Sequence, residues 1–211
     1  MTQPMRWPDV KRPLVAILRG VKPDEVEGIV DVLIETGFEM IEVPLNSPDP
    51  FDSIARICKR FGKDTLIGAG TVLTADDCSR VADIGGRLMV SPNVDVDVLA
   101  MAANGGMVTM PGVFSPTEAF LALRHGASAL KFFPASILGP SGIAAIRAVL
   151  PKDAVIGAVG GVSDKNFADY ISAGIQAFGL GSSLYKPGMN AGEVKTTAQA
   201  SVAAYDRAIG R

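Results

Sequence analysis

The sequence predicts an α/β fold of the (β/α)8 type, a TIM barrel, and three observations indicate it. Eight short apolar runs alternate with eight amphipathic segments at a spacing of roughly 20 to 26 residues, which is typical of parallel βα units. Each run ends in glycine or a polar residue, as barrel strands do at the end that carries chemistry. The 211-residue chain is near the lower size limit of this fold. A doubly wound open sheet would give the same alternation, but no G-x-G-x-x-G motif opens the chain.

The expected strands are the apolar runs that stop at turn-forming residues. In chain order they are Leu14–Leu18, Met40–Leu45, Thr65–Ala69, Leu88–Val90, Met107–Met110, Ala129–Phe133, Ala154–Val159 and Ala177–Leu180.

The expected helices are amphipathic and have start or stop signals at their ends. Pro23 with the acids after it is typical of a first turn, Ser115 and Ser163 are candidate N-caps, and Gly37 and Gly174 lie where helices should end. In chain order the helices are Pro23–Thr36, Pro50–Phe61, Ala75–Asp83, Val94–Ala103, Pro116–His125, Gly142–Leu150, Asp164–Ala173 and Ala191–Ile209.

No break in composition marks a second domain. We therefore expect residues 1–211 to form one barrel, with the segment 1–13, which contains Trp7, capping the bottom of the barrel. The N-terminus has no apolar signal-peptide core and no run reaches the ~18 apolar residues of a membrane span, so a cytoplasmic location is expected.

Composition excludes several classes of function. Lys and Arg total 20 against 22 Asp and Glu, a net charge of −2, so there is no basic excess for nucleic acid. The single histidine, His125, cannot build a zinc or di-iron cluster, and its place at a helix end predicts a C-cap rather than a catalytic base. Cys58 and Cys78 form no CxxC motif and are expected to be reduced packing residues.

Lys131 and Glu42 are the residues that most need an explanation. Both stand inside apolar strands with inward parity, where a charge is costly to bury. Desolvation lowers the pKa of a lysine and leaves a free amine that attacks carbonyls, and a neighbouring carboxyl group can move the protons of Schiff-base formation. A structural ion pair between the two residues is the alternative.

Other inward positions predict anion binding. Two glycine-bearing turns, Gly160-Gly161 and Gly181-Ser182, follow the last two strands, which is the usual phosphate position in this fold. On strand one Arg19 shares the inward face with Ile17, and on strand three we expect Ala69 and Thr71 to face inward. An ordinary turn is the alternative for the glycine pairs.

Together these residues resemble the family of 2-keto-3-deoxy-6-phosphogluconate and 2-keto-3-deoxy-6-phosphogalactonate aldolases. The resemblance extends from Ala16 to Ser182, nearly the whole chain, and the chain is similar to the galactonate branch in having Asn46 and Val159 where the gluconate enzymes have Arg and Thr. The most specific motifs are Ile41–Ser47, Gly68–Leu73, Lys131–Ala135 and Gly160–Val162.

The resemblance implies a class I aldolase that needs no metal or organic cofactor and forms a homotrimer. Lys131 would form the Schiff base and Glu42 would move protons. Substrate-binding residues would be Arg19, Asn46, Thr71, Val159, Gly160, Gly161, Gly181 and Ser182.

The expected reaction is cleavage of 2-keto-3-deoxy-6-phosphogalactonate to pyruvate and glyceraldehyde 3-phosphate. The residues leave open whether Arg19 binds the carboxylate or the phosphate. The 4-epimeric phosphogluconate substrate, a metal-free phosphosugar isomerase or epimerase, and a non-catalytic sugar-phosphate-binding barrel are the alternatives.

Overall fold

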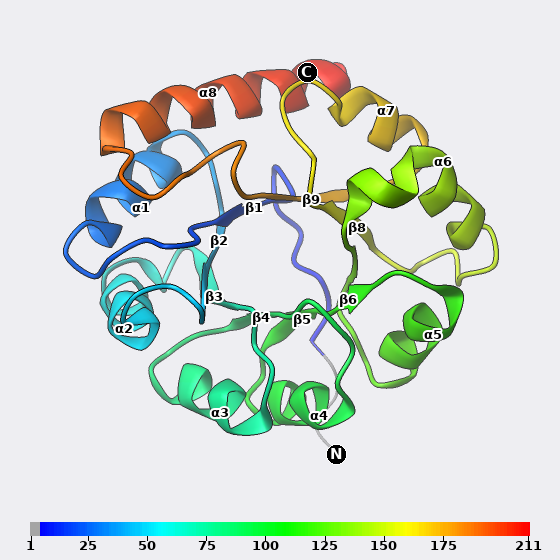
Figure 1. The fold of residues 1–211 in the computed structure, drawn as a ribbon, viewed down its shortest axis with the longest axis horizontal. Coiled ribbons are helices and arrows are strands. Elements are labelled where there is room, and N and C mark those ends of the chain that lie inside the picture. Colours follow the sequence, from blue (N-terminus) through cyan, green and yellow to red (C-terminus); the bar gives the residue numbers. More distant parts are fainter. Residues whose placement is uncertain (1–4) are drawn as a thin grey trace.

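The computed structural model describes residues 5–211, in which eight helices surround nine strands (Figure 1). The strands are β1 (Leu14–Ile17), β2 (Met40–Pro44), β3 (Leu66–Gly70), β4 (Leu88–Val90), β5 (Val108–Met110), β6 (Gly112–Val113), β7 (Leu130–Phe132), β8 (Ile156–Val159) and β9 (Ala177–Leu180). The helices are α1 (Val26–Glu35), α2 (Pro50–Phe61), α3 (Ala75–Asp83), α4 (Val96–Asn104), α5 (Pro116–Arg124), α6 (Ala135–Arg147), α7 (Phe167–Ser172) and α8 (Ala191–Ala208).

All the strand pairs are parallel, and the sheet order is β5-β4-β3-β2-β1-β9-β8-β7-β6. The fifth barrel strand is split into β5 and β6 at Pro111, because proline has no N–H to donate to a ladder. The N–H of Ala129 donates to the carbonyl of Thr109, and the N–H of Lys131 donates to that of Pro111. These bonds join the sheet's two ends, so the predicted (β/α)8 barrel is confirmed.

Alternate strand residues divide the core into two layers. Leu14, Ala16 and their counterparts face the helices, whereas Val15, Ile17 and Met40 belong to a separate cluster inside the barrel. This separation follows from the period of two along a strand. Glu42 and Lys131 have the inward parity that the sequence predicts, and they lie near the carboxyl ends of β2 and β7.

The predicted face of β3 was wrong. Ala69 packs in the outer layer between the sheet and the helices, and the inward positions are Gly68 and Gly70. The ladder pairs Gly68 with Glu42, and residues paired across a parallel ladder share a face. The strand also ends one residue later than predicted, at Gly70, so Thr71 lies beyond it.

Four helix starts also differ from the prediction, among them α1, which begins at Val26 rather than Pro23, and α4, which begins at Val96 rather than Val94. Helix α6 begins at Ala135 rather than Gly142, and non-helical Gly139, before Pro140, separates its two parts. Helix α7 begins at Phe167 with Asn166 as N-cap residue, so Ser163 does not cap it. In contrast, Ser115 forms the capping box of α5 and His125 is its C-cap, both as predicted.

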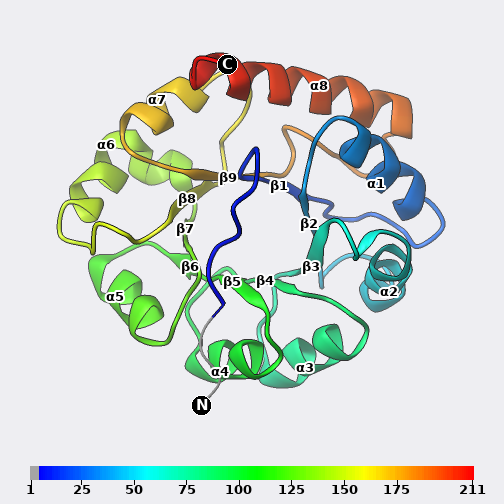
Figure 2. The same ribbon diagram turned by 180° about the vertical axis from the view of Figure 1, so that it is seen from behind.

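Residues 5–13, which precede β1, cross the amino-terminal opening of the barrel (Figure 2). Trp7 and Val10 pack against the inner cluster. Arg12 holds the segment to α8 through two bonds to Asp206, Nε to Oδ1 at 2.8 Å and Nη2 to Oδ2 at 2.6 Å. We propose that this segment caps the barrel and that the whole chain is one domain; the first four residues of the predicted cap, 1–4, lie outside the described residues.

Two further sequence expectations concern isolated features. Cys58 and Cys78 are free thiols in α2 and α3, and burial raises the pKa of each to about 11, which fits packing residues. Within residues 5–211 no helix is both long and apolar enough to cross a bilayer.

The close packing at Gly68 predicts that an added methyl group there destabilises the barrel. A Cβ at Gly68 would lie 1.9 Å from the carbonyl oxygen of Leu88 on the neighbouring strand, so the backbone must shift. We expect Gly68→Ala to lower the free energy of unfolding by about 1–3 kcal/mol or more, measured by urea denaturation.

Gly28→Ala is the matched control. Gly28 is exposed in α1, and a Cβ added there would have no atom within 4 Å, so alanine should stabilise the helix by roughly 0.5–1 kcal/mol. Equal stability of the two variants would contradict the packing described for β3 and β4.

Candidate active site

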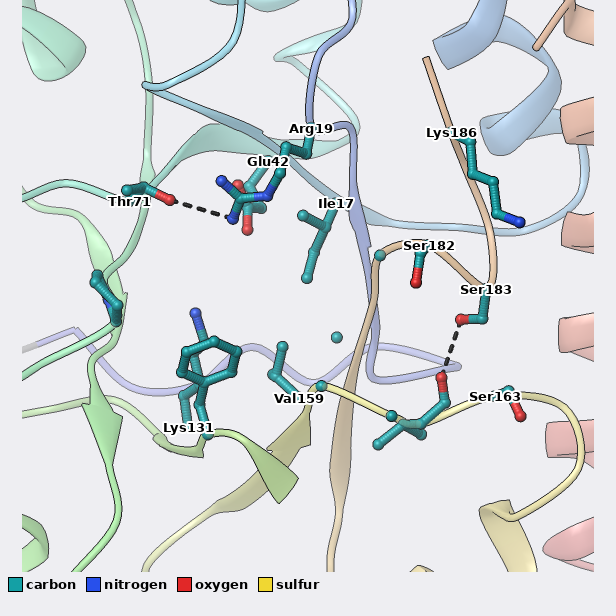
Figure 3. Close-up of a pocket in the computed structure, with 17 residues that line it drawn as sticks. Ile17, Arg19, Glu42, Thr71, Lys131, Val159, Ser163, Ser182, Ser183 and Lys186 are labelled. Atoms are coloured by element: carbon teal, nitrogen blue, oxygen red, sulfur yellow. Dashed lines mark hydrogen bonds between the residues drawn. The ribbon is translucent and has the colours of Figure 1, made fainter. Parts of the chain in front are cut away.

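A cavity of about 360 Å³ opens at the carboxyl ends of the strands (Figure 3). All the predicted site residues except Asn46 line it. The lining residues are Ile17, Arg19, Glu42, Thr71, Pro92, Lys131, Phe133, Val159, Gly160, Gly161, Val162, Ser163, Gly179, Gly181, Ser182, Ser183 and Lys186.

Lys131 extends into this cavity from β7. Its ladder neighbours on both sides are glycines, Gly112 on β6 and Gly157 on β8, and its Nζ lies 4.8 Å from the centroid of the Phe133 ring. The side chain is 6% exposed, and within residues 5–211 its ammonium group has no ion-pair partner. Burial lowers the pKa of Lys131, the carboxylate of Glu42 opposes this shift, and the charge of Arg19 adds to it. The ammonium form of Lys131 is therefore less favoured than that of an exposed lysine.

Glu42 is the carboxyl group that faces this amine in Figure 3. It is 2% exposed, and the space it occupies exists because position 70 is glycine: a Cβ there would lie 1.8 Å from Oε2 of Glu42. Burial raises the pKa of Glu42 to about 7, although the positive charges of Lys131 and Arg19 lower it. Oε2 is buried and accepts no hydrogen bond from the described residues. This carboxyl group can gain or lose a proton near neutral pH.

Arg19 follows β1 and is held by neutral partners. Its Nη1 donates to Oδ1 of Asn46, and its Nη2 donates to Oγ1 of Thr71 at 3.4 Å. Thr71 has a positive φ of 55°, which is unusual for a β-branched residue, and this turn brings its hydroxyl to the cavity. Within the described chain, neither guanidinium contact is to a carboxylate. Arg19 therefore keeps its charge available to an anionic ligand.

The opposite part of the cavity consists mainly of turns. Gly160 and Gly161 have φ values of 88° and 83°, and a Cβ at Gly161 would lie 2.5 Å from Cβ of Ser136. The backbone N–H groups of Gly161, Ser182 and Ser183 have no acceptor among residues 5–211. Unpaired backbone donors from neighbouring turns are suited to an anion.

Val159, the last residue of β8, lies between these two parts of the cavity (Figure 3). It packs beside Ile17 above Gly179, where a Cβ would lie 2.7 Å from Cγ2 of Val159. The middle of the cavity is therefore apolar, whereas both ends carry polar groups.

Sequence reasoning missed four polar or rigid lining residues, Pro92, Ser163, Ser183 and Lys186. Each lies in a loop that follows a strand, where the period of two no longer tells which residue faces inward. Their nearness to a strand end was the only available signal. Asn46 does not line the cavity, but its Oδ1 accepts a hydrogen bond from Arg19, which does.

Comparisons with known proteins agree with this geometry. The family model described as "Aldolase: KDPG and KHG aldolase" matches residues 10–200. A protein of Rhizobium meliloti (strain 1021) named probable 2-dehydro-3-deoxy-6-phosphogalactonate aldolase is 66% identical over 96% of both chains. The Escherichia coli (strain K12) protein named 2-dehydro-3-deoxy-6-phosphogalactonate aldolase is 45% identical, over 97% of this chain and all of the relative.

A solved structure described as native KDPGal agrees as well. It superposes with a TM-score of 0.95 at 45% identity, and the match covers 98% of this chain and all of the other. The resemblance inferred from the motifs is therefore confirmed, and the chain belongs to the KDPG and KHG aldolase family of carbon–carbon lyases.

Proposed function

We propose that this protein is a class I aldolase that cleaves 2-dehydro-3-deoxy-6-phosphogalactonate to pyruvate and D-glyceraldehyde 3-phosphate. The observation that carries the proposal is the buried amine of Lys131, with its lowered pKa, facing a carboxyl group whose pKa is about 7. The names of two relatives that align over nearly the whole chain support the choice of substrate.

The first half of the reaction builds an electron sink. The neutral amine of Lys131 adds to the C2 ketone of the substrate and gives a carbinolamine, which loses water to form an iminium ion. The departing hydroxide needs a proton and the nitrogen must lose one. Glu42 moves both, through a bound water, because a pKa near neutrality suits a group that must alternate between acid and base.

The second half breaks the C3–C4 bond. Glu42 takes the proton of the C4 hydroxyl, the oxygen forms the carbonyl of glyceraldehyde 3-phosphate, and the electrons of the broken bond move to the iminium nitrogen. The resulting enamine of pyruvate takes a proton at C3, and hydrolysis then releases pyruvate and restores the amine of Lys131. Oε2 of Glu42 has no hydrogen-bond partner among residues 5–211, so it can accept a hydrogen bond from the C4 hydroxyl or the water.

The two anionic ends of the substrate match the two polar ends of the cavity. The carboxylate is bonded directly to C2, so its partner must lie close to Lys131. Arg19 meets this requirement, because its charge shifts the pKa of both Lys131 and Glu42. Thr71 adds a hydroxyl donor, and the turns at Gly160-Gly161 and Gly181-Ser182 are left for the phosphate.

Two neutral residues distinguish the galactonate from the gluconate substrate. Val159 offers only methyl groups in the middle of the cavity, where the C4 hydroxyl would lie. Asn46 accepts a hydrogen bond from the guanidinium group of Arg19 and so orients it. We also propose the homotrimer that the family resemblance implies and the cytoplasmic location expected from the sequence. The proposed chemistry uses the side chains and backbone of this chain, the substrate's own groups and water, and it needs no metal or organic cofactor.

Lys131→Met tests the Schiff base. The variant loses the amine but keeps an unbranched apolar side chain, so the core should tolerate it. Borohydride reduction with pyruvate should add a stable adduct to the wild-type protein, measured as intact mass, and none to the variant, whose cleavage activity should be abolished.

Lys152→Met is the control, since Lys152 is exposed in the loop before β8, away from the cavity. Near-wild-type turnover by Lys131→Met would end the Schiff-base proposal. A wild-type protein without an adduct would leave the isomerase and non-catalytic alternatives, which proton exchange from substrate into solvent would separate.

Glu42→Gln tests the proton shuttle. Turnover should fall by roughly 10²–10⁴-fold, the range typical of a positioned acid or base. In the wild type, kcat/KM should rise with pH through about 7 as Glu42 ionises to accept the C4 hydroxyl proton, and the variant should lose this limb of the pH profile. A rate loss under tenfold would show that another group moves the protons.

The stability of the same variant gives an independent control. The pKa of Glu42 is raised in the folded state from 4.5 to about 7, so wild-type stability falls as pH rises between these values. Glutamine has no such dependence. Between pH 5 and pH 8, the free energy of unfolding of the wild type, measured by urea denaturation, should fall relative to that of the variant. The expected relative change is of the order of 1–3 kcal/mol.

Val159→Thr tests substrate choice. A threonine hydroxyl can hydrogen-bond one C4 configuration that valine does not stabilise, and one neutral hydrogen bond is worth about 0.5–1.5 kcal/mol, or roughly 2- to 13-fold. We expect the ratio of kcat/KM values to shift by this factor toward the phosphogluconate-derived epimer. Both epimers must be measured on both proteins, and an unchanged ratio would mean that Val159 does not contact C4.

A further inference from the structure

Lys186 is a cation at the mouth of the cavity that the expected site did not include. It lies in the loop between β9 and α8, lines the cavity and is exposed. Within residues 5–211 its ammonium group has no carboxylate at ion-pair distance. An unpaired lysine at a concave site is open to an anionic ligand.

The backbone around Lys186 is held at three points. Oγ1 of Thr197 on α8 donates to the carbonyl of Leu184 at 2.7 Å. The buried Tyr185 donates its hydroxyl to Oε1 of Glu25 at 3.2 Å. Pro187 packs on Gly20, where a Cβ would lie 2.6 Å from Cγ of the proline. The Cα of Lys186 is therefore fixed, and only its side chain remains free to adjust.

Lys186 and Arg19 lie in different parts of the cavity. In Figure 3 Arg19 lies with Glu42, Lys131 and Thr71, whereas Lys186 follows Ser182 and Ser183 on the other side. The charge of Arg19 shifts the pKa of Lys131 and Glu42, and the charge of Lys186 is not among the causes of either shift. The cavity thus has one cation beside the reacting carbon and another beside the unpaired backbone donors of Ser182 and Ser183.

Building on the proposed function, we propose that Lys186 binds the phosphate of the substrate and sets the preference for phosphorylated over unphosphorylated sugar acids. A phosphate already held by backbone N–H groups still has charge to neutralise, and a flexible ammonium group suits this because it acts as a point charge without a fixed orientation. Its exposure at the mouth also lets it attract the dianion before binding.

Lys165 provides a matched control. A second cavity of about 350 Å³ adjoins the first and shares Ser163, Ser182, Ser183 and Lys186 with it. Lys165 borders this second cavity but does not line the first. It is equally an exposed lysine near the same turns, so its substitution removes the same amount of charge without removing the proposed contact.

The experiment compares kcat/KM for 2-dehydro-3-deoxy-6-phosphogalactonate and for unphosphorylated 2-dehydro-3-deoxygalactonate. Lys186→Met should lower the value for the phosphorylated substrate by roughly tenfold, mainly through KM, and leave the other unchanged. Lys186→Arg should retain most of the preference, and Lys165→Met all of it. Because attraction by an exposed charge is screened, the wild-type value should fall with ionic strength more steeply than that of Lys186→Met.

Pyruvate trapping on Lys131 separates this inference from the proposed function, because pyruvate has no phosphate. If the wild type neither traps pyruvate nor cleaves the substrate, the proposed function fails. If the wild type does both, three results each overturn the role of Lys186: an unchanged preference in Lys186→Met, an equal loss in Lys165→Met, or a loss of pyruvate trapping in Lys186→Met.

Discussion

The structure depends on holding an amine and a carboxyl group out of water at one end of an apolar barrel. Burial acts on the two in opposite directions: it lowers the pKa of Lys131 and raises that of Glu42, so both are displaced toward their neutral forms. Their mutual attraction opposes both shifts without cancelling either. Among residues 5–211 the two groups form no ion pair, and both line the same cavity.

Glycine makes this arrangement fit inside the barrel. Gly70 leaves the volume that the Glu42 carboxyl group fills, and the ladder neighbours of Lys131 have no side chains. Glycine also shapes the turns at the end of the cavity proposed for the phosphate, where Gly160 and Gly161 have positive φ values. The barrel wall is close-packed, and the glycine positions determine where polar side chains fit inside it.

Arg19 and Lys186, two cationic side chains that line the cavity, lie in different parts of it, which distinguishes its two ends. Arg19, held by two neutral side chains, lies beside the amine, and Lys186, on a loop fixed by Tyr185 and Pro187, lies at the mouth. The apolar surface of Val159 lies between them. A substrate with a carboxylate next to its ketone and a phosphate at its far end matches this order in one orientation only.

The amino-acid sequence was sufficient to predict the barrel class, the approximate bounds of the strands and of every helix except α6, and the inward parity of Glu42 and Lys131. Hydrophobic period and parity are local properties of the chain. The motifs, which match the family in the same order along the chain, also indicated the aldolase family correctly.

Strand parity gave the wrong face for β3, where the strand end was misplaced: Ala69 faces outward, and Gly68 and Gly70 face inward. The three-dimensional contacts were needed to learn that Thr71 turns into the cavity, that Asn46 acts through Arg19, and that Lys186 reaches the mouth. These residues lie in loops, where the direction of a side chain depends on contacts with distant segments such as Glu25 and Gly20 rather than on the neighbouring sequence.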